Sequence, residues 1–492
     1  MQGNTVSVKF RNILILVAFI PFLFPASEVA QGAPKPVMVH YMPWFVSQPY
    51  SGSWGYHWTM NYFNPNVINP TNGEQEIASW YYPLIGPYDS LDPAVLEYHV
   101  LLMKLAGIDG VIVDWYGQDN YYDYAINNQR TLALFNYTRK AGLKFSLCYE
   151  DATIQTEIAN GTMNGITVTA GNAIAHAQQT LRYAETNFFT DSSFLRLNNV
   201  PVLLNFGPQY FYYSSNWTSI FSVLNTTNQP AFFTEDNRLA VGSGAFDWPP
   251  MSLSGGGTNT LTPAQLQGYL VGFDQKGGSW PAFVSSGFPR FHDIYAQAGA
   301  GSSYGYLDDA NGSTFNNTLS RAMTNNSSVV QIVTWNDFGE GTIVEPTVDY
   351  GYRDLGIVQD LRRQYLDPTF PYHTNDLAMA FRLYNLRKQY GSTPALAAEL
   401  NRTFTNIVSG AVATANLQLT GMESTKSVIY NLSYDGVQLR FLIGGYVGSS
   451  MQVMMSTNLA TWQSIQTFPV TTNVSLFSTA TTQAVCSFFK VQ

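Results

Sequence analysis

Residues 329–340 read Val329-Val330-Gln331-Ile332-Val333-Thr334-Trp335-Asn336-Asp337-Phe338-Gly339-Glu340, an apolar run followed by two carboxylates. The run is β-branched and continuous rather than alternating, which is typical of a strand buried on both faces. Cleavage of a glycosidic bond needs one carboxylic acid to protonate the leaving oxygen and a second carboxylate as base or nucleophile. The pattern therefore predicts a strand that delivers such a pair, with Glu340 as the acid and Asp337 as its partner. The alternative is that both acids only cap the segment that follows.

Seven similar runs precede this one, and segments with helical spacing lie between them. The eight predicted strands are Val37–Tyr41, Gly110–Trp115, Lys144–Tyr149, Pro201–Phe206, Ala231–Thr234, Gly244–Trp248, Pro281–Val284 and Val329–Thr334. The clearest helix is Pro93–Ala106, with Ser90 and Asp92 as candidate N-caps and Gly107 at its end. Further helices are expected at Gln129–Gly142, Asn172–Phe188, Ser313–Met323, Leu355–Tyr365 and Asp376–Tyr390. This alternation predicts an α/β fold, a (β/α)8 TIM barrel.

Acidic and aromatic residues gather where the predicted strands end, which is where active sites of this fold lie. Asp114, Glu150, Asn205 and Asn336 are candidates for binding sugar hydroxyls, and salt bridges within the barrel mouth are the alternative for the first three. Aromatic faces stack on the C–H faces of sugar rings. The candidate walls are Tyr41, Trp44, His57, Trp58, Trp115 and Tyr116. For each of these aromatic residues, packing in the core is the competing interpretation.

The composition excludes some classes of partner. Only 12% of the 492 residues are charged, the net charge is −9, and no cluster of Lys or Arg is present, so a nucleic-acid partner is not expected. His and Cys spacings of known metal motifs are missing, and no Gly-rich phosphate loop follows a strand. We therefore expect no metal and no cofactor. A disulfide between Cys148 and Cys486 is not expected, because they fall in different predicted domains.

The N-terminus has the pattern of a secretory signal. Lys9 and Arg11 precede the apolar run from Ile13 to Phe24, and Ala30 and Gly32 fit the small-residue rule for cleavage after position 32. We therefore expect a secreted or periplasmic monomer that does not stay inserted in a membrane. The expected layout is a signal peptide at 1–32, a catalytic barrel at 33–370, a helical connector at 371–411 and an antiparallel β-sandwich at 412–492.

Several motifs in the right order resemble glycoside hydrolase family 99, the endo-α-mannosidase family. They are His40-Tyr41-Met42-Pro43-Trp44-Phe45, Pro83-Leu84-Ile85-Gly86-Pro87-Tyr88-Asp89-Ser90, Ala106-Gly107-Ile108-Asp109-Gly110, Trp115-Tyr116-Gly117 and Glu340-Gly341-Thr342 with Glu345-Pro346. The family's catalytic motif is Asn-Glu-Trp-His-Glu, and Asn336-Asp337-Phe338-Gly339-Glu340 stands in its place. The shortened first acid and the Phe-Gly pair look more like family 71, the α-1,3-glucanases.

The two resemblances imply different stereochemistry. In family 99 the first carboxylate assists attack by the sugar's own 2-hydroxyl, and the anomeric configuration is retained. In family 71 the corresponding carboxylate activates water, and the configuration inverts. The shorter Asp337 leaves more room for water, which favours inversion slightly.

We therefore expect a secreted glycoside hydrolase that acts on an α-linked polysaccharide, either α-mannan or α-glucan. Two alternatives are a carbohydrate-binding protein without turnover and a family 99 relative that accompanies polysaccharide biosynthesis. The C-terminal module could bind polysaccharide through Trp462, or only space and attach the enzyme.

Overall fold

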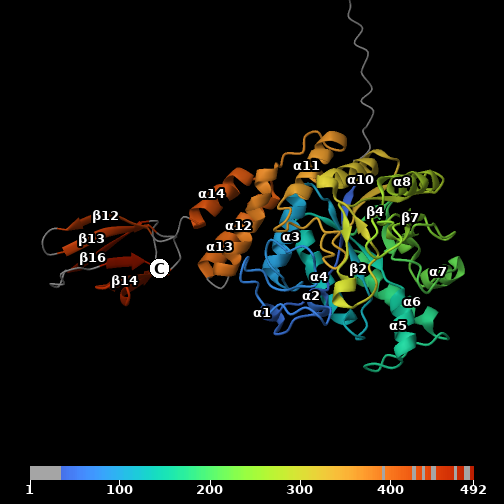
Figure 1. The fold of residues 1–492 in the computed structure, drawn as a ribbon, viewed down its shortest axis with the longest axis horizontal. Helices are drawn as coiled ribbons and strands as arrows, with labels where there is room; N and C mark the ends of the chain where they lie inside the picture. The colour runs from blue at the N-terminus through green and yellow to red at the C-terminus, as the bar shows by residue number, and fades with distance from the viewer. Residues whose placement is uncertain are drawn as a thin grey trace, which may run out of the picture. The chain divides into compact units, whose positions relative to one another are not determined.

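The computed structural model describes residues 35–390, 394–423, 428–434, 438–444, 450–469, 474–480 and 488–491 (Figure 1). The predicted signal peptide at 1–32 and Cys486 lie outside the described residues. Cys148 is a buried free thiol in the third barrel strand. None of the helices in the described ranges combines the length and the apolar character that crossing a bilayer requires.

Eight parallel strands close into a barrel, which confirms the predicted fold class. Each strand pairs with the next in chain order, the last pairs with the first, and β3 pairs directly with β5. The barrel strands are β1 (Val37–Tyr41), β2 (Gly110–Trp115), β3 (Lys144–Tyr149), β5 (Val200–Asn205), β6 (Ala231–Glu235), β7 (Gly244–Phe246), β8 (Val284–Gly287) and β11 (Val329–Ile332). The short strand β4 (Arg196–Leu197) pairs antiparallel with β5, and β9 (Phe291–His292) pairs with β10 (Tyr306–Leu307).

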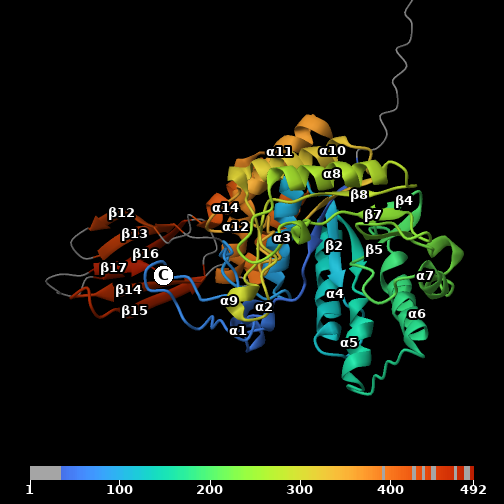
Figure 2. The ribbon, with the colours of Figure 1, turned by 45° about the vertical axis from the view of Figure 1, so that its right-hand side comes forward.

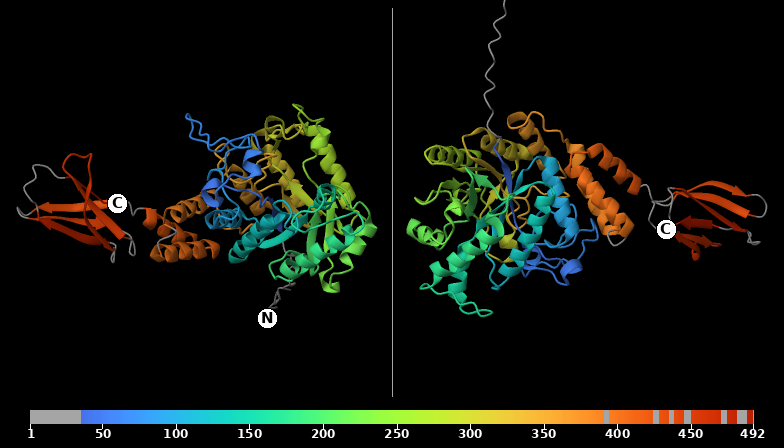
Figure 3. Two further views of the ribbon diagram at one scale, coloured as in Figure 1. Left: turned by 90° about the horizontal axis from the view of Figure 1, so that it is seen from below. Right: turned by 180° about the vertical axis from the view of Figure 1, so that it is seen from behind.

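Helices lie on the outside of these strands, as Figures 2 and 3 show. The longer ones are α3 (Pro93–Ala106), α4 (Tyr124–Lys140), α5 (Ala152–Asn160), α6 (Ala173–Ala184, extended by a π-turn at Glu185–Phe189), α7 (Ser214–Phe221), α8 (Pro263–Gly277), α10 (Ser313–Thr324) and α11 (Arg353–Tyr365). Single turns form α1 (Gln48–Ser51), α2 (Tyr56–Thr59) and α9 (Tyr295–Ala298), and 3₁₀ turns lie at Thr226–Asn228, Met251–Leu253 and Ala310–Gly312.

Helix α3 has the bounds that its end signals predict. The Asp92 side chain accepts a hydrogen bond from the Ala94 N–H at 2.9 Å, Pro93 occupies the first turn, and Gly107 ends the helix with φ of 82°. Ser90, the other candidate cap, instead accepts from the Phe45 N–H at 3.1 Å. Asp92 is therefore the cap, and Ser90 holds the loop after β1.

Strand β8 is displaced from the predicted Pro281–Val284. It runs from Val284 through Ser285 and Ser286 to Gly287, small residues that look like a loop in the sequence. A Cβ at Gly287 would lie 2.7 Å from the Leu319 backbone, so α10 packs directly against this strand. The small residues make that close approach possible, and Pro281, which has no N–H to donate, lies outside the strand.

Three helices follow the barrel, namely α12 (Thr374–Tyr390), α13 (Pro394–Val408) and α14 (Val412–Glu423). The change to strands that we expected near Val412 begins instead at Val428. Residues 412–423 are helical because Ala415, Leu419 and Met422 repeat at helical spacing and are buried. Helix α12 packs against α3 of the barrel.

The remaining strands form two antiparallel three-stranded sheets, as the sequence predicted for this region. One contains β12 (Val428–Tyr434), β13 (Gln438–Gly444) and β16 (Val474–Ala480), and the other β14 (Ser450–Ser456), β15 (Gln463–Pro469) and β17 (Phe488–Val491). Trp462 is half-buried, with the Lys490 ammonium 4.6 Å from its ring centre.

Candidate active site

The loop after β11 holds the two predicted catalytic carboxylates in one tight turn. The Asp337 N–H donates to Thr334 Oγ1 at 2.8 Å, and Asp337 Oδ1 accepts the Glu340 N–H at 3.0 Å. The hydroxyls of Thr334 and Thr342 lie 3.0 Å apart and close the base of the turn. Asp337 is 5% exposed and Glu340 is half-buried. The turn therefore sets both side chains at the C-terminal end of a barrel strand.

The Asp337 side chain caps the turn, as the alternative interpretation predicts, but the Glu340 side chain has no such structural role. Glu340 Oε2 is buried and has no hydrogen-bond partner in the described part of the chain. Burial and the neighbouring Asp337 carboxylate raise the pKa of Glu340 well above its usual range. Burial raises the pKa of Asp337 only to about 6, because the backbone N–H groups of Glu340 and Gly339 oppose the shift. Two neighbouring acids with separated pKa values suit an acid and a base.

Further carboxyl groups stand at the ends of neighbouring strands. Burial, with the charge of Asp337, raises the pKa of Asp114 to about 8, and burial raises that of Glu235 to about 7. Glu150 shares a hydrogen bond with Asp114, and burial followed by the charge of Asp114 raises its pKa well above the usual range. The structure thus brings the predicted Asp114 and Glu150 together with the β11 pair. Protonated carboxyls in such a cluster can donate hydrogen bonds to sugar oxygens as well as accept them.

Asn336 ties the ends of β1 and β11 together. Its Oδ1 accepts the Met42 N–H at 2.8 Å, and its Nδ2 donates to the Met42 carbonyl and to the Tyr88 hydroxyl, both at 3.0 Å. All of its side-chain groups are used by the protein, and the side chain is completely buried. Asn336 therefore supports the site rather than facing a sugar.

Tyr41, predicted as a sugar-binding wall, belongs to a buried network beneath the site. Its hydroxyl lies 2.9 Å from His99 Nδ1, and His99 Nε2 lies 3.1 Å from Glu345 Oε1. The Tyr88 hydroxyl donates to Glu345 Oε2 at 2.7 Å. Tyr41, His99 and Glu345 are at most 2% exposed. The network joins α3 to the loop after β11, and Tyr41 has no surface left for a ligand.

Two residues that were predicted to line the sugar-binding site, and one that was predicted to bind sugar hydroxyls, also lie in the protein interior. The Trp58 indole donates to the Tyr88 carbonyl at 2.7 Å, and the Trp115 indole donates to Asn128 Oδ1 at 3.0 Å. Asn205 donates to Asp151 Oδ1 at 3.2 Å and is completely buried. The core interpretation holds for Trp58 and Trp115, and Asn205 helps to hold Asp151.

Trp44, His57 and Tyr116 line one cavity of about 610 Å³. The rings of Trp44 and His57 stack with centroids 4.1 Å apart and planes 6° apart. Tyr116 reaches the carboxyl cluster through a side-chain hydrogen bond with Asp114. Burial and nearby Arg130 lower the pKa of His57 to about 3, so His57 is neutral. These three residues form an aromatic surface next to the acids.

Three residues near the catalytic pair were not assigned from the sequence. Trp248 lies close enough to Glu340 to oppose the rise in its pKa, and burial, with the charges of Glu340 and Asp337, raises the pKa of Tyr295. Glu235 raises the pKa of Glu340 as well. Glu235 follows the predicted strand Ala231–Thr234 and Trp248 ends the predicted strand Gly244–Trp248, so strand-end position could have identified them. Tyr295 lies in the single-turn helix α9, for which the sequence has no comparable signal.

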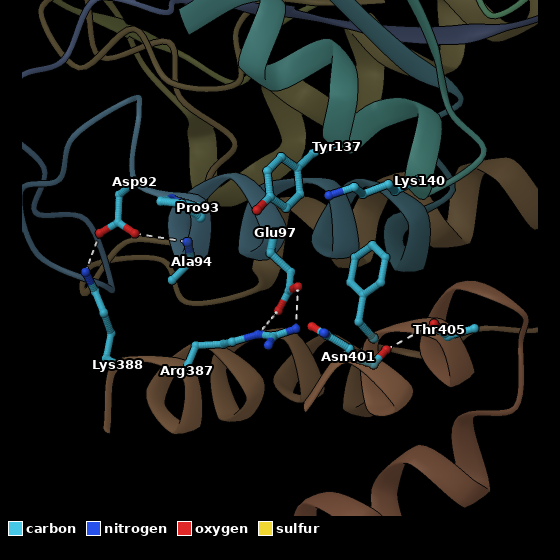
Figure 4. A pocket seen from close by; sticks show the side chains of 11 residues that line it. Asp92, Pro93, Ala94, Glu97, Tyr137, Lys140, Arg387, Lys388, Asn401 and Thr405 are labelled. Carbon is cyan, nitrogen blue, oxygen red and sulfur yellow. Dashed lines mark hydrogen bonds and ion pairs between the residues drawn. The ribbon is translucent and has the colours of Figure 1, made fainter. Parts of the chain in front are cut away.

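A larger cavity, of about 760 Å³, lies elsewhere, between α3–α4 and α12–α13 (Figure 4). Its main charged groups are paired across it. Arg387 binds both oxygens of Glu97 at 2.8 Å, and Lys388 pairs with Asp92. These pairs attach α12 to α3, and we assign no chemistry to this cavity.

Among the described residues, Asp119, Glu157 and His176 form the one group whose potential metal-binding atoms all lie within 4.8 Å of one another. His176 Nε2 lies 2.6 Å from Asp119 and 3.4 Å from Glu157. Hydrogen bonds to Asp119 and Glu157 raise the pKa of His176 to about 9. These contacts describe an ion-pair cluster, and we assign no further chemistry to it.

Comparison with known proteins agrees with the geometry. A model of glycosyl hydrolase family 99 matches residues 34–371. The glycoprotein endo-alpha-1,2-mannosidase-like protein of Danio rerio is 20% identical over 337 residues, which cover 63% of this chain and 71% of that protein. The glycoprotein endo-alpha-1,2-mannosidase of Mus musculus is 29% identical over 135 residues, 25% of this chain and 28% of that protein.

Among solved structures, the family 99 endo-alpha-mannosidase from Bacteroides thetaiotaomicron is 18% identical, with a TM-score of 0.48. The match covers 67% of this chain and 96% of that one.

Proposed function

Because the chain belongs to glycosyl hydrolase family 99, it is an endo-α-mannosidase-like glycoside hydrolase, and we propose that it cleaves α-mannan with Glu340 and Asp337. The observation that carries this proposal is the buried turn after β11, in which the two acids have different surroundings. The names of the two curated relatives support mannan, since both contain endo-alpha-1,2-mannosidase. α-1,3-Glucan is the second candidate, and it rests on the Asn336-Asp337-Phe338-Gly339-Glu340 motif.

In the proposed reaction Glu340, whose pKa is raised by burial and by the Asp337 charge, transfers its proton to the glycosidic oxygen as the C1–O bond breaks. Asp337 is ionised above pH of about 6 and accepts a proton from the nucleophile. The nucleophile is the sugar's own 2-hydroxyl, which leads to retention, or water, which leads to inversion. Asp114, Glu150 and Glu235 bind hydroxyls around the cleaved bond.

We also propose that the enzyme acts outside the cytoplasm. The pattern of Lys9, Arg11 and the apolar run up to Phe24 supports export. The alternative of a binding protein without turnover is less consistent with Glu340, whose buried, unpartnered oxygen suits a proton donor.

The experiment is a panel of α-mannan, α-1,3-glucan and a β-linked glucan, with products followed by NMR of the anomeric protons. We expect cleavage of α-mannan, and the first-formed anomer identifies the nucleophile. Binding of α-mannan without any product would instead favour the binding protein. Cleavage of α-1,3-glucan alone would favour the second substrate. The surface variant Asp360→Asn, whose carboxylate is 77% exposed, is the matched control for substitutions of an acid.

A further inference from the structure

The 610 Å³ cavity beside the acids contains a buried arginine. Arg130, on α4, is only 3% exposed, yet it lines this cavity together with Trp44, His57 and Tyr116. It is the only Lys or Arg among the lining residues, and His57 is neutral there. The cavity therefore combines an aromatic surface with one buried cation, Arg130, and one carboxylate, Asp123.

Arg130 is not paired by the protein. Its Nη1 donates to Asn127 Oδ1 at 2.8 Å, on the same helix. Its Nε is buried without a partner, and within the described ranges its guanidinium forms no ion pair and its Nη2 no hydrogen bond. Buried charges in proteins are normally paired, because removing a charge from water is costly. Because Nε is closed to solvent, Nη2 is the guanidinium nitrogen that can donate a charge-assisted hydrogen bond to an anion in the cavity.

The nearest acids do not replace such an anion. Asp89 and Asp123 are the carboxylates that act on Arg130, and burial lowers the pKa of Arg130 despite them. Asp89 Oδ2 accepts the Ser47 N–H at 3.0 Å and the Ser51 hydroxyl at 2.7 Å. Asp123, which also lines the cavity, accepts from Asn127 at 3.0 Å. Both acids accept hydrogen bonds from other groups, and neither is hydrogen-bonded to Nη2 of Arg130 in the described part of the chain.

We propose that this cavity is an accessory subsite for a sugar unit that carries one acidic group, a carboxylate, a phosphate or a sulfate ester. The acidic group binds Nη2 of Arg130, and the sugar ring lies against Trp44 and Tyr116. The proposal rests on the proposed glycoside hydrolase function and adds the class of substrate. A net charge of −9 disfavours a densely charged polyanion, so a neutral glycan with scattered acidic substituents fits best.

Tyr116, which lines the cavity, connects it to the proposed catalytic acids. Tyr116 hydrogen-bonds Asp114, and the charge of Asp337 acts on both of them. The proposed subsite requires that a glycan whose scissile bond lies between Asp337 and Glu340 reach past Tyr116 into this cavity. An acidic group on a neighbouring sugar then selects which bond is cut.

The test compares phosphorylated α-mannan with the same mannan after its phosphate has been removed, using the full chain. We expect kcat/KM to be higher for the phosphorylated substrate by about tenfold or more, mainly through KM, as for a charge-assisted hydrogen bond. Arg130→Gln should abolish this preference, Arg130→Lys should keep part of it, and added salt should reduce it. Lys140→Gln, an exposed residue on the same helix, is the control and should keep the full ratio.

Binding is measured separately with the inactive variant Glu340→Gln, by calorimetry with phosphorylated, sulfated and uronic-acid-containing oligosaccharides, which distinguishes the three acidic groups. Tighter binding of one of these than of the neutral oligosaccharide, lost on adding Arg130→Gln, would support the subsite. Equal affinity for acidic and neutral oligosaccharides in the presence of Arg130 would overturn it, whatever the enzyme cleaves. Failure of the proposed function would appear differently, as unchanged turnover in Glu340→Gln itself.

Discussion

The Glu340 N–H donates to Asp337 Oδ1 at 3.0 Å, so one proposed catalytic carboxylate positions the backbone of the other. Asp337 thus has a structural role and a chemical role in the same turn. The two roles can be separated, because an asparagine keeps the accepting oxygen and loses the charge.

We expect Asp337→Asn to keep the turn and lose activity, whereas Asp337→Ala loses both. The alanine variant should be about 1 kcal/mol less stable than the asparagine variant, the usual contribution of a capping side chain. Thermal unfolding and hydrolysis of α-mannan measure the two effects. An active Asp337→Asn enzyme would show that Asp337 is only a cap.

The pH dependence of kcat/KM should reflect the separated pKa values of the pair. Asp337 must be ionised to act as a base, so activity should rise as the pH passes about 6. Activity should fall again only where Glu340 loses its proton, well above the usual range of a glutamic acid. Initial rates on α-mannan across a pH series test this. A rise centred near pH of about 4, the ordinary value for an aspartate, would contradict the assignment.

Asn336→Ala should destabilise the protein, because it leaves the buried N–H and carbonyl of Met42 without partners. The expected loss is about 2 kcal/mol in the free energy of unfolding. Asn316→Ala, at an exposed position on α10, is the control and should change stability little. Chemical denaturation measures both. A stable Asn336→Ala variant with a raised KM would instead make Asn336 a ligand to substrate.

The His176 cluster should make stability depend on pH in the alkaline range. The pKa of His176 is raised from 6.5 to about 9 in the folded chain, so its contribution is fully present below pH of about 6.5 and is lost as the pH rises through about 9. His176→Gln should remove this part of the dependence. Melting temperatures between pH of about 6 and 10 measure it. If the melting temperature of His176→Gln falls by the same amount over this pH range, the pH dependence comes from other groups.

The barrel was predictable because strands buried on both faces leave continuous apolar runs, as in Gly110–Trp115 and Lys144–Tyr149, whose bounds match the structure. Strand β8 was misplaced because it is built from Ser285, Ser286 and Gly287, whose small size matters only once α10 packs on them. Helix α14 was missed because Ala413, Ala415, Leu417 and Leu419 alternate with polar residues, a spacing that is typical of a strand.

In the candidate active site, the sequence predicted which residues lie at the strand ends but not which way their side chains face. Strand ends gather at one mouth of a barrel, which brought Asp114 and Glu150 together with Asp337 as expected. Whether a side chain there faces a ligand or the protein depends on partners distant in sequence. Tyr41 meets His99, and Trp58 meets the backbone of Tyr88, so neither faces the cavity.

The most direct test of the central claim is the turnover of α-mannan by Asp337→Asn, Glu340→Gln and the double variant. Two groups that act as a unit on one bond should each lower kcat by about a hundredfold or more when removed. The double variant should then be little worse than the poorer single variant, because the second loss removes nothing further. Either single variant within about twofold of the wild-type rate would contradict the account, since general acid or base catalysis contributes far more than that.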